Sequence, residues 1–114
     1  MKNLLKLTLL SFVLVASNAL QSRRGSVTPY LYNKSGQTIH WHTTYADMSS
    51  KNGKLENKQQ LALAPLPSTL IVDGEDNTAA YMNLLRDLRD KEQSIGTLEI
   101  KADGTVRRYL GAPQ

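Results

Sequence analysis

Two histidines at alternating positions, His40 and His42, are the residues of this chain whose spacing could hold a metal ion. Residues i and i+2 of a strand point to the same face, roughly 6.5 to 7 Å apart, so two imidazoles there can share zinc or copper. Such a site needs a third or fourth ligand, and the chain has no further histidine and no cysteine. Asp47, Glu56 or another carboxylate, or a methionine such as Met48, would have to complete it.

The metal site is therefore an alternative hypothesis, and the preferred interpretation is two imidazoles on the solvated side of a hairpin. Because histidine titrates near neutral pH, the same pair could also sense acidity.

The densest acidic run, Asp73 to Asn77, resembles a calcium loop only in its alternating oxygen atoms. The sixth position is Thr78 where the loop needs glycine, and the twelfth is Leu84 where it needs glutamate. The run instead predicts a turn followed by acids that favour the positive start of a helix.

Four aromatic residues, Tyr30, Tyr32, Trp41 and Tyr45, could form a flat platform for a sugar or a peptide. The preferred interpretation is a wall of the core, because these rings are a large part of the aromatic supply. An aromatic face left uncovered would instead indicate a binding surface.

Catalytic motifs are missing from the sequence. It contains no Gly-x-Ser-x-Gly turn, no phosphate-binding or dinucleotide glycine pattern and no His-Glu-x-x-His. The sequence therefore predicts a protein that is not an enzyme and needs no cofactor, with a small secreted hydrolase as the second alternative.

The first 19 residues predict a secretory signal peptide. Lys2 and Lys6 precede an apolar run over residues 7–16, and the small residues Ser17 and Ala19 occupy both cleavage-site positions. The run has ten residues, whereas a bilayer crossing needs roughly 20, so no permanent membrane anchor is expected. We expect a flexible arm over residues 20–26, one domain over 27–114, and a secreted or periplasmic location, which suits a chain without cysteine.

Charge argues against a nucleic-acid partner. The whole chain has a net charge of +4, but two of its 14 basic residues lie in the leader, which leaves 12 bases against 10 acids. A balance of +2 with scattered bases is typical of an ordinary solvated surface.

The clearest pair of strands is predicted over Val27–Asn33 and Thr38–Tyr45, joined by a turn at residues 34–37. A four-residue loop would place Tyr32 opposite Ile39 and Tyr30 opposite Trp41, so that these four side chains form the core wall. Leu31 would lie on the other face with the two histidines. Pro29 lacks an N–H and predicts that its strand lies at a sheet edge.

The remaining elements follow from turn residues and periodicity. Residues 46–58 predict a long loop or a weak hairpin that turns at Asn52-Gly53, and short strands follow at Gln59–Ala64 and Thr69–Val72. A helix capped by Asp76 or Asn77 is predicted from an apolar stripe: Tyr81, Leu84, Leu85 and Leu88. A final hairpin, Thr97–Lys101 with Thr105–Leu110, is expected to have a three-residue loop with Gly104 left-handed and Ile100 opposite Val106.

These elements predict an α+β fold: one small antiparallel sheet of two hairpins and short middle strands, with one amphipathic helix packed on it. A β-sandwich with one helix is the alternative. The predicted function is an exported, non-enzymatic binding protein whose partner is another protein: an inhibitor, an immunity-type protein or an envelope accessory protein. Because loops on a rigid scaffold usually carry recognition, the residues predicted to contact the partner are Trp41, Tyr45, Lys54, Glu56, Asp73 and Glu75.

Overall fold

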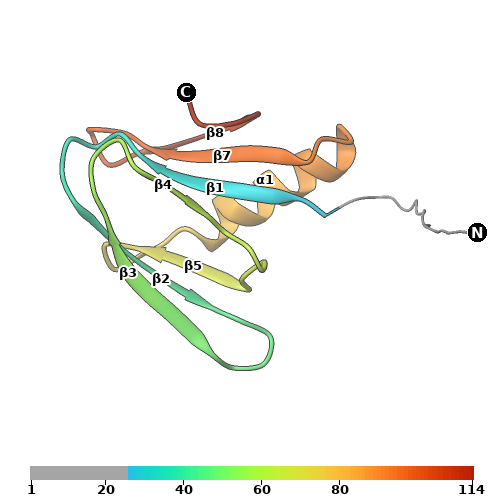
Figure 1. The fold of residues 1–114 in the computed structure, drawn as a ribbon, viewed down its shortest axis with the longest axis horizontal. Helices are drawn as coiled ribbons and strands as arrows, with labels where there is room; N and C mark the ends of the chain where they lie inside the picture. Colours follow the sequence, from blue (N-terminus) through green and yellow to red (C-terminus); the bar gives the residue numbers. More distant parts are fainter. Residues whose placement is uncertain (1–25) are drawn as a thin grey trace, which may run out of the picture.

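The computed structural model describes residues 26–114, which form two four-stranded sheets and one helix (Figure 1). The predicted signal peptide and residues 20–25 of the predicted arm lie outside the described residues. The elements are β1 (Thr28–Asn33), β2 (Ile39–Thr44), β3 (Ser50–Leu55), β4 (Gln60–Ala62), β5 (Thr69–Val72), β6 (Glu75–Asp76), α1 (Thr78–Asp90), β7 (Ile95–Ile100) and β8 (Val106–Leu110). The helix within this range is not long and apolar enough to cross a membrane.

The strands divide into a first sheet of order β4-β1-β7-β8 and a second sheet of order β3-β2-β5-β6. Figure 1 shows the two sheets close together where β1 leads into β2 and β3 leads into β4, and diverging toward the other end. The predicted α+β class is confirmed, but the single sheet is wrong. The purely antiparallel arrangement is also wrong, since β1 and β7 are parallel neighbours.

The predicted first hairpin is wrong, because β1 and β2 belong to different sheets. Leu31 is fully buried in the core, whereas Tyr30 and Tyr32 lie half-buried on the opposite face of β1. The aromatic wall with Trp41 therefore does not form. Leucine has no polar side-chain group to desolvate, so complete burial is favourable. A half-buried tyrosine keeps its hydroxyl near water.

Pro29 is also misplaced by the edge prediction, since β1 lies between β4 and β7. Its carbonyl oxygen accepts a hydrogen bond from the Leu63 N–H at 2.8 Å, and the two backbone polar groups of one strand residue face the same neighbour. The Pro29 nitrogen, which carries no hydrogen, therefore faces the chain just beyond the end of β4 at Ala62. The other side is intact, because the Thr28 N–H donates to the Ser94 carbonyl at 2.7 Å.

The polar segment 46–58 contains a full strand rather than a loop or a hairpin that turns at Asn52-Gly53. β3 pairs with β2 over six residues, from Ile39 with Leu55 to Thr44 with Ser50, and Asn52-Gly53 lies in the middle of the strand. Lysine, asparagine and glycine have low β propensity, so their sequence alone does not predict a strand. Pairing with β2 stabilises the extended conformation that this propensity does not favour.

Three predictions for the second half of the chain are confirmed, whereas the strand predicted at Thr97–Lys101 lies at Ile95–Ile100 and β6 was not predicted. β5 has the predicted bounds, α1 begins after Asn77, and the last hairpin pairs Ile100 with Val106 with Gly104 at φ +85°. Asn77 makes no side-chain capping bond; the Asp76 carboxylate accepts from the Thr78 N–H instead, at 2.9 Å.

The core lies between the two sheets and α1 (Figure 1). Leu31 and Leu98 come from the first sheet, and the helix contributes Tyr81, Leu84 and Leu88. The other buried apolar residues are Ile39, Leu55, Leu63, Leu70, Val72 and Ile100. The helix packs closely on β7, since a Cβ at Gly96 would lie 2.8 Å from a methyl carbon of Leu84.

A buried amide ties the two sheets together where they meet. The Asn33 side chain is fully buried, and its Nδ2 donates to the Gln37 carbonyl at 2.6 Å and to the Leu55 carbonyl at 2.9 Å. Its Oδ1 accepts from the Ser35 N–H at 2.9 Å. One side chain therefore holds the end of β1, the crossover turn and the end of β3 in one arrangement.

Asn33→Asp should lower the free energy of unfolding by about 3 kcal/mol, because an acceptor would replace the donor that serves two carbonyls. Asn57→Asp is the matched control, since Asn57 uses only its Oδ1, which accepts from the Gly36 N–H. Urea unfolding of both variants tests this. Equal losses in the two variants would contradict the role given to Asn33.

Candidate functional site

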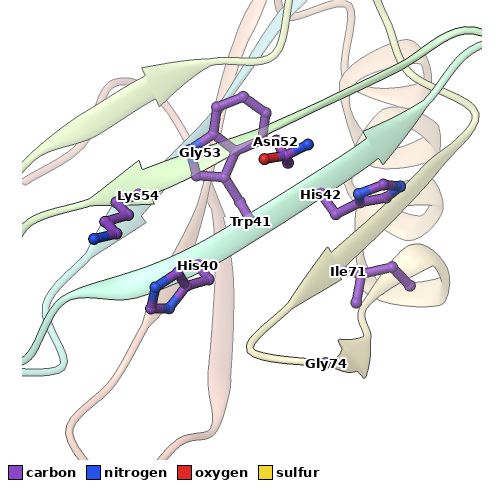
Figure 2. Close-up of a pocket in the computed structure, with 8 residues that line it drawn as sticks. All are labelled: His40, Trp41, His42, Asn52, Gly53, Lys54, Ile71 and Gly74. Atoms are coloured by element: carbon purple, nitrogen blue, oxygen red, sulfur yellow. The ribbon is translucent and has the colours of Figure 1, made fainter.

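The exposed face of the second sheet carries an open groove of about 410 Å³ (Figure 2). Side chains alternate along a strand, so His40 and His42 share this face with their cross-strand partners, Lys54 and Asn52. Ile71 of β5 lies on the other side of His42. The complete lining is His40, Trp41, His42, Asn52, Gly53, Lys54, Ile71 and Gly74.

Trp41 points to the opposite face of β2 and lies across Gly53, its partner on β3. A Cβ at Gly53 would be 3.0 Å from Cζ2 of the indole, so the ring occupies the place of the missing side chain. The indole is half-buried and packs against the core. The glycine allows the ring to extend over the outermost strand of the sheet.

Asp73 fastens the acidic turn to β2 beside His40. Its Oδ1 accepts from the His40 N–H at 2.8 Å and lies 3.6 Å from Nδ1 of the imidazole. Its own N–H donates to the His40 carbonyl at 2.7 Å. These contacts hold Asp73 at φ +50°. This conformation is energetically unfavourable for residues other than glycine. The histidine ring is thereby placed at the rim of the groove.

The described residues, 26–114, contain no group of three or more histidine, aspartate or glutamate side chains placed to hold a metal ion. The proposed third ligands are engaged elsewhere: Asp47 accepts from Ser49, and Glu56 accepts from the Thr38 hydroxyl at 3.1 Å. Met48 is 93% exposed on the loop between β2 and β3. Within this range, His40 and His42 lack the further ligand that the metal hypothesis requires.

The structure brings together some of the predicted binding residues. Trp41 and Lys54 line the groove, and Asp73 lies at its rim. Glu56 follows β3, and Glu75 pairs with Val72 at the far edge of the sheet; neither lines the groove.

Tyr45 follows β2 and does not line the groove. Its hydroxyl accepts from the Thr43 hydroxyl at 3.2 Å, and the Lys51 ammonium is 5.5 Å from its ring centre. Burial, and secondly the nearby Tyr45, raise the pKa of Tyr81 to about 12. Tyr81 is therefore a neutral donor to the Pro67 carbonyl, at 2.8 Å. These residues support the core beneath β2.

Sequence reasoning missed four groove residues, Asn52, Gly53, Ile71 and Gly74. The first two were assigned to a turn, and only pairing with β2 places them beside the histidines. The strand at Thr69–Val72 was predicted, but nothing in its sequence says that it would lie next to β2.

The outer face of the first sheet carries a second aromatic group, separate from Trp41. Tyr30 and Tyr109 lie on either side of Thr97, and Tyr32 lies next to Glu99. Glu99 is only 6% exposed, and the Tyr109 hydroxyl donates to its Oε1 at 3.3 Å. The Arg107 guanidinium lies 4.8 Å from the Tyr109 ring centre. The alternative of a single platform from Tyr30, Tyr32, Trp41 and Tyr45 is therefore wrong, because Tyr30 and Tyr32 lie on the first sheet and Trp41 lies on the second.

Comparisons of this chain with protein-family models, with curated proteins and with solved structures give no match.

Asp76→Ala should destabilise the protein at neutral pH and have a smaller effect in acid. Hydrogen bonds from the Thr78 side chain and backbone hold the pKa of Asp76 below its ordinary value of 3.8. A lowered folded-state pKa means that the ionised carboxylate stabilises the fold above the unfolded pKa, and that this stability is lost as pH falls through the folded value.

Urea midpoints at pH 7, 5 and 2.5 measure this effect. Asp76→Asn is the matched control, because it keeps an acceptor and cannot titrate. A difference between wild type and Asp76→Ala that stays constant with pH would contradict the prediction.

Proposed function

We propose that this chain is an exported, non-enzymatic binding protein that recognises another protein through the exposed face of its second sheet. The observation that carries the proposal is the groove, in which His40, His42, Asn52 and Lys54 lie beside an aliphatic contact at Ile71. Hydrogen-bonding and charged side chains next to an apolar contact are typical of protein recognition surfaces.

The distribution of charge favours a protein over a polyanion. Lys54 lies on one side of the groove, while Asp73 lies at its rim and Asp76, which pairs with Ile71, shares the same face. A nucleic acid requires a continuous surface of positive charge. A protein surface can match both signs, which gives specificity and register.

The groove residues also lie on a rigid support. His40 and His42 are in the middle of a strand that is paired on both sides, and the β2–β3 hairpin is paired over its whole length. Side chains placed by strands lose less conformational entropy on binding than side chains on loops.

Export and the absence of catalysis complete the proposal. The predicted signal peptide directs the chain to the envelope or the medium, and a chain without cysteine suits the periplasm. In that setting the protein acts as an inhibitor, an immunity-type protein or an envelope accessory protein.

Affinity capture from an envelope and medium extract of the source cells tests the function. Wild-type protein should retain one stoichiometric protein at moderate salt. Lys54→Glu should weaken this retention about tenfold, because it reverses the charge of the groove lysine. Lys101→Glu is the matched control, since Lys101 is exposed and lies on the first sheet's last hairpin.

Mass spectrometry would identify the retained protein, and sequencing the N-terminus of the native chain would locate the cleavage point. Empty capture, or equal retention by Lys54→Glu, would contradict binding at this face. A native chain that keeps residues 1–19 would contradict export.

A further inference from the structure

Among the described residues, 26–114, the β3 edge of the second sheet offers unpaired backbone groups in a regular row. His40 and Thr44 direct their backbone groups toward β5, as shown by the bonds from the Asp73 N–H to the His40 carbonyl and from the Ser68 N–H to the Thr44 carbonyl. The alternate residues Trp41 and Thr43 must therefore bond to β3, because backbone groups alternate in direction along a strand. Trp41 and Thr43 are opposite Gly53 and Lys51.

It follows that the backbone groups of Ser50, Asn52 and Lys54 point away from β2. β3 is an edge strand of six residues, longer than the other edges of the two sheets, β4, β6 and β8. A paired, extended edge of this length is a template for one more strand.

The edge has an aromatic anchor as well as backbone groups. Because Gly53 has no side chain, the Trp41 indole lies over it, with its ring atoms within 3.0 to 3.3 Å of the place of a Cβ. A residue added opposite Gly53 would be next to the half-buried indole. Tryptophan is among the residues that contribute most to protein interfaces.

Two lysines determine which strand fits. Lys54 lies on the groove face opposite His40, and Lys51 lies on the other face, near the Tyr45 ring. Lysines on an edge discourage pairing with neutral or basic strands. Opposite charges directly across a strand pair are favourable, so the same residues select a segment with acids at those two places.

We propose that β3 binds an extended acidic segment of the partner protein as an added antiparallel strand, with the Trp41 indole against its central apolar residue. Reading along the segment, an acid would lie opposite Lys54, an apolar residue opposite Gly53, any residue opposite Asn52 and an acid opposite Lys51. This inference rests on the proposed function and adds its mode of recognition.

Fluorescence of the single tryptophan tests the proposal. The probe is the blocked peptide acetyl-Thr-Glu-Leu-Thr-Glu-Thr-amide, and its control has lysine in place of both glutamates. Wild-type protein should show a saturable change in Trp41 emission with the acidic peptide, and the basic peptide should bind at least about tenfold more weakly.

Three variants separate strand addition from other contacts. Asn52→Pro and Asn52→Ala both remove the groove side chain, but only Asn52→Pro also removes the outward N–H, without touching the bonds to β2, so it should bind about tenfold more weakly than Asn52→Ala. Lys54→Glu should shift the preference toward the basic peptide. Urea unfolding of each variant confirms that it is folded.

The absence of a saturable change at millimolar peptide, or equal binding by Asn52→Pro and Asn52→Ala, would overturn strand addition. Self-association that Asn52→Pro abolishes would assign the edge to a second copy and would also overturn the proposal. A protein captured through Lys54 whose binding ignores Asn52→Pro would leave the proposed function standing and remove only this mode.

Discussion

The fold depends on the amide of Asn33. The chain leaves the first sheet at this residue and enters the second sheet six residues later at Ile39. The Asn33 side chain donates hydrogen bonds to the Gln37 carbonyl in this connection and to the Leu55 carbonyl at the end of β3. Its backbone adds two more links, to the Gln59 carbonyl and from the Lys58 N–H. A buried amide that satisfies several backbone groups is costly to replace, because each would otherwise be left without a partner.

This junction determines what the rest of the chain can do. The core fills the space between the sheets, and α1 closes it with Leu84 and Leu88 against β7. The salt bridge from Arg108 to Asp87, at 2.8 Å, joins the helix to β8 and holds the pKa of that carboxyl below its ordinary value. With the inner faces used for the core, the outer faces are left to side chains that prefer water or a partner.

The second sheet then combines three features on one hairpin. The histidines, Asn52, Lys54 and Ile71 have their side chains on one face, the Trp41 indole lies on the other, and Gly53 lets the indole reach the outermost strand. Each feature alone has an ordinary structural explanation: surface histidines, a partly buried tryptophan and lysines that protect an edge. Their meeting on one hairpin is the basis of the proposed recognition of another protein.

The sequence by itself determined the local elements of the second half of the chain: the apolar stripe of α1, the short strand β5 and the Ile100–Val106 register, because these depend on periodicity and turn residues close together in the chain. It also placed His40 and His42 on one face. Only the tertiary structure decided the partners of β1 and β2, since Leu31 and the tyrosines beside it offer two possible core faces and a buried asparagine selects between them. The groove likewise required β3, a polar segment that becomes a strand only because β2 provides an edge to pair with.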